Sequence, residues 1–181
     1  MREDLAAITA GAEQIAFQDI FREHYRLVYA IARRAVGANE EAEEVAQEVF
    51  IKLYEQWPRL IIRTSLAAWL ARVTINTASN RLRRRRQEQR LQTRLSGAGE
   101  PDHPSAAEIY ENGEDRAVVR AALARLRPKD RACLLARYSG LSYRETAETL
   151  GVRINSVGKL LARAETRFKL VYDQIDQGVL K

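Results

Sequence analysis

The chain has 181 residues, enough for one large domain or two small ones, and 46% of them are hydrophobic, as in ordinary globular proteins. Lys and Arg outnumber Asp and Glu by 30 to 24, and the resulting net charge of +6 favours a polyanionic partner. A single cysteine, Cys133, excludes an internal disulfide. No segment approaches the roughly 18 consecutive apolar residues of a membrane span, so we expect a cytoplasmic protein with no direct membrane insertion.

Apolar residues recur at helical spacing along the first half, after an N-terminal extension over residues 1–16. The spacing predicts a helix from Phe17 that is closed by Gly37 in the left-handed conformation. Asn39 is expected to cap a second helix, which ends at Pro58. Ser65 is expected to cap a third helix, which runs into four consecutive arginines.

The second and third expected helices carry opposite charge. On the second, acids surround Gln47 and Ile51 on the side away from the expected core, which indicates either a solvated face or a docking surface for a basic protein helix. On the third, Asn76 and Asn80 precede the arginines. Asparagine amides can pair with base edges and arginines with phosphates, so this helix is expected to bind nucleic acid, with an unspecific polyanion tether as the alternative.

Glycines, two prolines and a surplus of acids in "LSGAGEPDHPSAAEIYENGED" predict a flexible linker over residues 91–115. The predicted fold class is therefore all-α, with two small helical domains over residues 17–90 and 116–175 and a tail over residues 176–181. No segment has a strand pattern worth defending.

The second domain has the pattern of a helix–turn–helix. Ser142 and Glu145 form an expected capping box, Gly151 ends that short helix, and Asn155 is expected to cap a longer last helix. Cationic and polar side chains near the start of such a second helix suit major-groove reading and phosphate anchoring. The set is Arg153, Asn155, Ser156, Lys159, Arg163 and Arg167. A simple helical hairpin with a solvated basic face is the alternative.

Three segments in this order closely resemble an extracytoplasmic-function sigma factor of the sigma-70 family: "EEAEEVAQEVFIKLYEQ", "AAWLARVTINTASNRLRRRR" and "LRPKDRACLLARYSGLSYRETAETLGVRINSVGKLLARA". The resemblance runs from about Phe17 to Phe168. It implies a region 2-like helical bundle and a region 4-like helix–turn–helix domain. It also implies a transcription initiation factor that binds core RNA polymerase, recognises the promoter −10 and −35 elements and aids strand opening.

The resemblance assigns three surfaces and one further partner. The surface for the clamp helices of the largest polymerase subunit is Glu44, Gln47, Glu48 and Ile51. The −10 surface is Asn76, Asn80, Arg81, Arg83 and Arg84, with Arg59 and Arg63 in a connector that captures a flipped base. The −35 surface is the set on the last helix given above. An anti-sigma factor, commonly membrane-associated, is implied as the protein that sequesters these surfaces.

The last helix departs from the family pattern, because Val157 is followed by Gly158, Lys159 and Leu160. The missing arginine at Leu160 leaves the −35 base preference open, and Gly158 costs about 1 kcal/mol of helix propensity relative to alanine. A glycine there also permits closer approach of the backbone to DNA.

Besides a sigma factor, the alternatives are an enzyme, an autonomous regulator and a sigma-like protein with an anti-regulatory role. An enzyme is not expected, since two histidines and one cysteine form no metal-ligand, phosphate-binding or nucleophile motif, and no metal or cofactor is expected. An autonomous helix–turn–helix regulator remains the alternative, and it would bind its operator without polymerase.

Overall fold

In a computed structural model of the chain, the described residues are 2–56, 65–96 and 114–179. They form helices and contain no strand, which confirms the predicted all-α class. The helices are α1 (Arg2–Val36), α2 (Asn39–Gln56), α3 (Leu66–Ser96), α5 (Glu114–Arg125), α6 (Pro128–Tyr138), α7 (Tyr143–Leu150) and α8 (Ile154–Asp176). No helix in this part of the chain combines the length and apolar character that crossing a bilayer requires.

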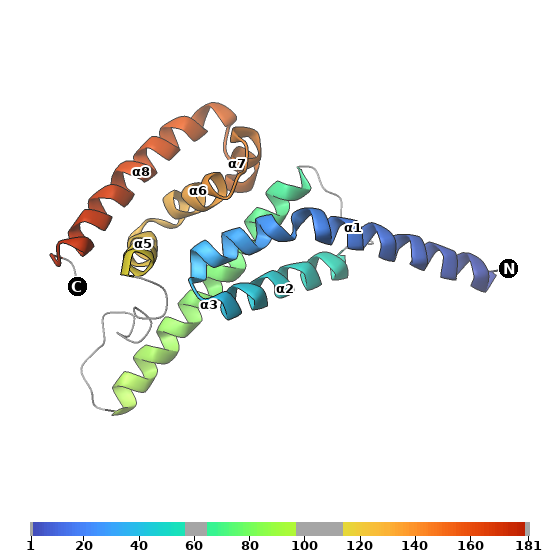
Figure 1. Cartoon of the computed structure of the whole chain (residues 1–181), viewed down its shortest axis with the longest axis horizontal. Coiled ribbons are helices and arrows are strands. Elements are labelled where there is room, and N and C mark those ends of the chain that lie inside the picture. Colours follow the sequence, from blue (N-terminus) through green and yellow to red (C-terminus); the bar gives the residue numbers. More distant parts are fainter. Residues whose placement is uncertain (1, 57–64, 97–113, 180–181) are drawn as a thin grey trace.

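The N-terminal group consists of α1, α2 and α3, which pack side by side (Figure 1). Their shared core is built from small and branched apolar side chains, among them Val28, Val45, Val49, Leu53 and Leu70. Burial of each such side chain contributes about 1.5–3 kcal/mol, so the amphipathic stripes hold the group together. Helix α1 begins far upstream of the predicted start at residue 17, and α3 continues to Ser96, past the expected start of the linker.

The turn between α1 and α2 differs in detail from the expectation. Gly37 has φ of +92°, in the left-handed region predicted for it. The Ala42 N–H donates to the Ala38 carbonyl, so the cap of α2 lies at Ala38 and not at Asn39. Asn39 instead accepts a hydrogen bond from Arg33 Nε at 2.6 Å, which ties the start of α2 to the end of α1.

The C-terminal group consists of α5 to α8. Both hydrogen bonds of the predicted capping box between Ser142 and Glu145 are present at the start of α7, and Gly151 ends that helix with φ of 64°. The prediction that Asn155 caps α8 is wrong: the cap is Arg153, with extended backbone, and Asn155 lies in the first turn. The Ser156 N–H donates to the Arg153 carbonyl at 2.9 Å, and this tight first turn starts the helix earlier than expected.

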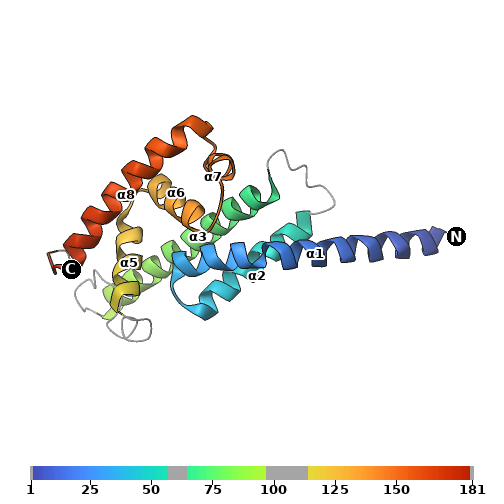
Figure 2. The ribbon, with the colours of Figure 1, turned by 45° about the horizontal axis from the view of Figure 1, so that its top comes forward.

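The two groups are packed against each other in the described residues. Figure 2 shows α6 and α7 beside α3, and one hydrophobic cluster contains side chains of both groups. Ile31, Ala71 and Ile75 of the N-terminal group lie in this cluster with Leu134 and Leu135 of α6. The sequence had predicted two domains, but it had not predicted this shared core.

Candidate functional site

The acidic face of α2 lies on the surface, as the sequence predicted. Glu44 and Gln47 are exposed, Ile51 is half exposed, and Glu48 is partly buried. Tyr54, one turn beyond Ile51, is 63% exposed and packs edge-on against Phe17 with ring centroids 5.2 Å apart. The face thus combines carboxylates, an amide and two apolar side chains, which is the composition of a protein interface with polar surroundings. Sequence reasoning had missed Tyr54, although its spacing of three from Ile51 was visible.

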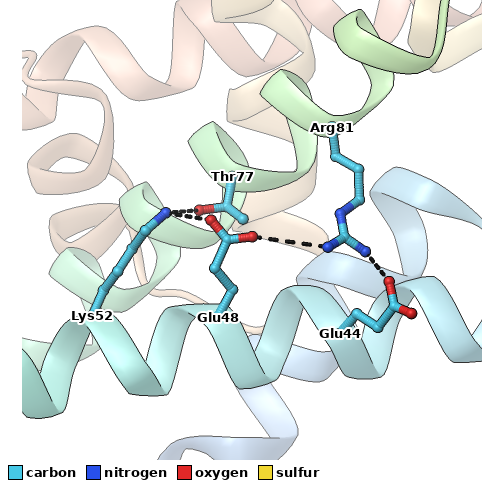
Figure 3. Close-up of polar contacts among 5 residues, drawn as sticks. All are labelled: Glu44, Glu48, Lys52, Thr77 and Arg81. Atoms are coloured by element: carbon cyan, nitrogen blue, oxygen red, sulfur yellow. Dashed lines mark hydrogen bonds and ion pairs between the residues drawn. The ribbon is translucent and has the colours of Figure 1, made fainter. Parts of the chain in front are cut away.

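Part of this acidic face is turned toward α3 (Figure 3). Arg81 of α3 donates a hydrogen bond to Glu44, and its Nη2 lies 3.9 Å from Glu48 Oε2. Lys52 Nζ donates to Glu48 Oε1 at 2.6 Å and to the Thr77 hydroxyl at 3.1 Å. The carboxylates expected to meet polymerase therefore already bind cations of this chain.

The remaining −10 candidates are presented on the outer side of α3. Asn76 and Asn80 are exposed and lie one helical turn apart, so their amides share a face. Arg83 and Arg84 are exposed as well. The −10 candidates thus place amide groups and cations along one helix. Arg59 and Arg63, the two candidates in the connector, lie outside the described residues.

One turn beyond Arg81, Arg85 forms a second ion pair between α3 and α2. Its Nη1 lies 3.0 Å from Glu41 Oε1, and Glu41 is outside the set predicted to bind polymerase. These pairs join the arginine-rich part of α3 to the acidic start of α2.

The −35 candidates on α8 divide into two groups. Arg153, Asn155 and Lys159 are exposed at or near the start of the helix, and Ser156 beside them is partly buried. Farther along, Arg163 Nη2 lies 3.3 Å from Asp130 Oδ1, and Arg167 donates to Asp130 Oδ2. Arg163 and Arg167 therefore also balance a carboxylate of α6 that is 1% exposed.

Asp130 is a residue that sequence reasoning missed. It lies three and four residues before Cys133 and Leu134, both buried, so it occupies the inward stripe of α6. An acid on such a stripe needs partners, because an unpaired buried charge is strongly unfavourable. An acid at an inward position of the helix was therefore the signal in the sequence that Asp130 is buried and paired with cations.

Helix α7 of the helix–turn–helix packs against the start of α3, and each helix end is capped by the other group. Glu148 Oε2 accepts a hydrogen bond from the Ser65 N–H at 2.9 Å, at the N-terminus of α3. Arg72 Nε donates to the Thr149 carbonyl at 3.0 Å, and its second nitrogen donates to the Glu148 carbonyl, at the C-terminus of α7. Both contacts satisfy backbone groups that a helix end leaves without an internal partner.

A third contact between the groups joins α6 to the −10 candidates. Arg131 Nη2 donates to the Ser79 hydroxyl at 3.1 Å, directly beside Asn80. The two helical groups thus meet next to the side chains that the sequence assigned to promoter binding.

A cleft of about 1100 Å³ opens between α1, α5, α6 and α8. Apolar side chains, including Leu123, Leu134 and Phe168, line it together with several arginines. Among these, Arg120 Nη1 is buried without a hydrogen-bond partner, and burial, aided by Arg33 and Arg116, lowers the pKa of Arg120. The cleft is therefore apolar inside and electropositive at one edge.

The described residues offer no cluster of His, Cys, Asp and Glu that could hold a metal ion. Cys133 is fully buried, as predicted, and burial raises the pKa of its thiol, with the carboxylates of Asp130 and Glu165 acting in the same direction. This thiol is a packed side chain and not an activated nucleophile.

Comparison with known proteins finds two matching families. The chain matches the family Sigma-70 region 2 over residues 20–88 and the family Sigma-70, region 4 over residues 116–168. It is 29% identical to the ECF RNA polymerase sigma factor SigM of Mycobacterium tuberculosis, across 98% of this chain and 87% of that protein.

Two solved structures share the fold. One is the sigma factor RpoE in complex with the anti-sigma factor NepR from Bartonella quintana, with a TM-score of 0.59, 22% identity, and coverage of 87% of this chain and 97% of that one. The other is CnrH in complex with the cytosolic domain of CnrY, with a TM-score of 0.61, 20% identity, and coverage of 93% and 95%.

The two region matches cover the acidic and basic helices of the N-terminal group and the helix–turn–helix of the C-terminal group. Both regions belong to a family of transcription regulators. The chain belongs to the sigma-70 family as an extracytoplasmic-function sigma factor, which directs RNA polymerase to promoters.

Proposed function

We propose that the acidic face of α2 is the surface through which this sigma factor binds core RNA polymerase. Glu44, Gln47, Glu48 and Ile51 are its central residues, and Tyr54 extends it. The observation that carries the assignment is the position of Glu44, which stays 62% exposed while it contacts Arg81. A basic helix of the largest polymerase subunit can therefore reach this carboxylate, and complementary charge favours that approach.

We assign −10 recognition to α3, on the exposed face that carries Asn76 and Asn80. Their amides are suited to hydrogen bonds with the edges of unstacked bases, and the nearby Arg83 and Arg84 are suited to phosphates. These contacts support strand opening, because binding of the separated strand offsets the free energy that is lost when bases unstack.

The −35 element is assigned to the start of α8, where Arg153, Asn155 and Lys159 are exposed. A helix–turn–helix presents the N-terminal residues of its second helix to the major groove. Arg163 and Arg167 lie farther along α8 and form ion pairs with Asp130. In this proposal, each binds phosphate only when its ion pair with Asp130 is broken.

Binding to both elements requires the two helical groups to separate. The element names place them about 25 base pairs apart, which is roughly 85 Å of duplex at about 3.4 Å per base pair. In the described structure, α6 contacts Ser79 on the −10 helix and α7 contacts its first turn. We therefore interpret the packed arrangement as the state of the chain away from promoter DNA.

An anti-sigma factor is the second protein partner that we propose. One structural relative was solved with an anti-sigma factor bound and another with the cytosolic domain of CnrY bound, and the cleft between α1 and α8 supports a protein partner here. Its apolar lining and the Nη1 of Arg120, which is buried without a hydrogen-bond partner, suit a segment that carries both apolar and acidic side chains.

We further propose that the protein acts in the cytoplasm together with core polymerase, and that it has no catalytic activity of its own. Run-off transcription tests the proposed function directly: purified chain is added to core polymerase on a library of genomic fragments, and the start sites are mapped. Start sites that depend on the added chain are expected. If the chain instead protects a duplex site unaided and does not stimulate initiation, it is an autonomous regulator.

A further inference from the structure

Arg81 belongs to two of the proposed surfaces at once. It is a −10 candidate on α3, and its guanidinium contacts Glu44 and Glu48, both of which are proposed to bind polymerase (Figure 3). A guanidinium held by two carboxylates is not free to bind a phosphate of the promoter. Binding of a partner at the docking surface therefore affects the binding of DNA at the −10 surface.

The contact is open to competition from outside. The side chain of Arg81 is 33% exposed, and those of Glu44 and Glu48 are 62% and 43% exposed. Ion pairs with this exposure are weak, so a cation of polymerase can replace Arg81 at little cost. Glu48 is shared with Lys52, whereas Glu44 is contacted by Arg81 of α3. Competition is therefore expected mainly at Glu44.

We propose that Arg81 is a positioning residue that couples polymerase docking to promoter binding. In the free chain, Glu44 and Glu48 hold its guanidinium against α2. When a cationic helix of polymerase takes these carboxylates, Arg81 is released toward DNA. The coupling rests on the docking surface proposed above, and linkage requires it to act in both directions: the loss of Arg81 must strengthen polymerase binding.

The neighbouring arginines of α3 do not link the −10 candidates to the docking surface. Arg83 and Arg84 are exposed without involving the docking surface, so polymerase does not gate them. Arg85 pairs with Glu41, which is outside that surface. Among these four arginines, only Arg81 is a −10 candidate that also contacts carboxylates of the docking surface.

The first arm of the test uses the free full-length chain and a fluorescent 12-nucleotide single strand. The Glu44→Gln/Glu48→Gln variant is expected to bind the strand about two- to fivefold more tightly than the original chain, the range of a released surface ion pair. The slope of log K against log salt should steepen by about 0.7, the value for one added phosphate contact on a single strand.

A matched control removes the same charge elsewhere. The Glu43→Gln/Glu55→Gln variant loses two exposed acids of α2 that are outside the docking surface, so it is expected to leave the salt slope unchanged. Adding Arg81→Gln to Glu44→Gln/Glu48→Gln should cancel both the gain in affinity and the steeper slope. If the control steepens the slope equally, or the gain persists without Arg81, the proposal is overturned.

The second arm measures the affinity of the same variants for core polymerase. Arg81→Gln is expected to bind about two- to fivefold more tightly, because the docking carboxylates lose an internal competitor. A purely structural arginine would give unchanged or weaker binding, and either result overturns the coupling. Glu44→Gln/Glu48→Gln reports on the docking surface itself. If that variant binds polymerase normally, the proposed docking surface fails, independently of what Arg81 does with DNA.

Discussion

The carboxylate of Glu148 on α7 accepts a hydrogen bond at 2.9 Å from the backbone N–H of Ser65, at the start of α3. A negative charge at a helix N-terminus is favourable, because it meets unsatisfied N–H groups and the positive end of the helix dipole. Arg72 returns the same kind of contact to the carbonyls at the end of α7. Helix α3 and the helix–turn–helix thus cap each other in the packed state.

Replacing Glu148 by alanine should shift the chain toward separated helical groups. A charge-assisted hydrogen bond of this kind contributes about 1.5–3 kcal/mol, so the ratio of open to packed chains should rise at least tenfold. Small-angle X-ray scattering is the measurement, with a larger radius of gyration as the expected result. Arg144→Ala, an exposed change on the same helix, is the control. An unchanged radius for Glu148→Ala would show that the shared apolar core alone holds the groups together.

Replacing Glu44 and Gln47 by lysine should abolish polymerase binding and leave the helices intact. Both side chains are exposed, so no core contact is lost, while a cationic polymerase helix would meet two new positive charges. Titration of labelled core polymerase measures the affinity, and far-ultraviolet circular dichroism checks the fold. Glu43→Lys, on α2 but outside the docking surface, should retain most of the binding. Equal affinity for the original chain and the double variant would remove the docking assignment.

Asn80→Ala should reduce the formation of the open complex more than the affinity of the closed complex. The amide is exposed on α3 and is proposed to contact a base that is available only after strand separation. Permanganate reactivity of promoter thymines measures opening, and filter binding at low temperature measures the closed complex. Gln87→Ala, an exposed amide farther along the same helix, should leave both unchanged. An equal loss in both measurements for Asn80→Ala would argue against base reading.

Lys159 and Arg167 were equivalent in the sequence, but the structure distinguishes them. Lys159 is exposed, whereas Arg167 bonds to the buried Asp130. Lys159→Ala should therefore weaken −35 duplex binding and reduce its salt slope by about one, with unchanged stability. Arg167→Ala should lower the free energy of unfolding by about 1–3 kcal/mol, because Asp130 loses a charged partner. Urea denaturation and fluorescence anisotropy of the two variants separate these roles.

Local signals in the sequence predicted local structure well. The Ser142–Glu145 capping box, the left-handed Gly151 and the buried Cys133 follow from residues a few positions apart, and all three are present. The acidic character of α2 and the basic character of α3 were equally visible, because each depends on one helix. The residues involved interact within about one turn, where helical periodicity determines which side chains are neighbours.

Contacts between helices were not predictable in the same way. Nothing in the spacing of Glu44 and Arg81 shows that their faces meet, since this depends on how α2 and α3 cross. Glu148 and Ser65 are 83 positions apart, and no local pattern links them. The sequence therefore predicts which side chains bind partners, but it does not show which of them bind each other within the chain.

Gly158→Ala tests the one departure on α8 that packing does not explain. A Cβ at this position would lie 3.9 Å from the Tyr143 ring, an ordinary contact, so the described chain does not require a glycine there. Alanine should raise the free energy of unfolding by about 1 kcal/mol through helix propensity, measured by urea denaturation. We expect weaker binding of the −35 duplex by the same variant, because the added methyl group would keep the helix farther from DNA. Increased stability with unchanged DNA affinity would instead show that α8 does not approach the DNA backbone closely at Gly158. The −35 contact would then be made by Arg153 and Lys159, before and after Gly158 in the chain.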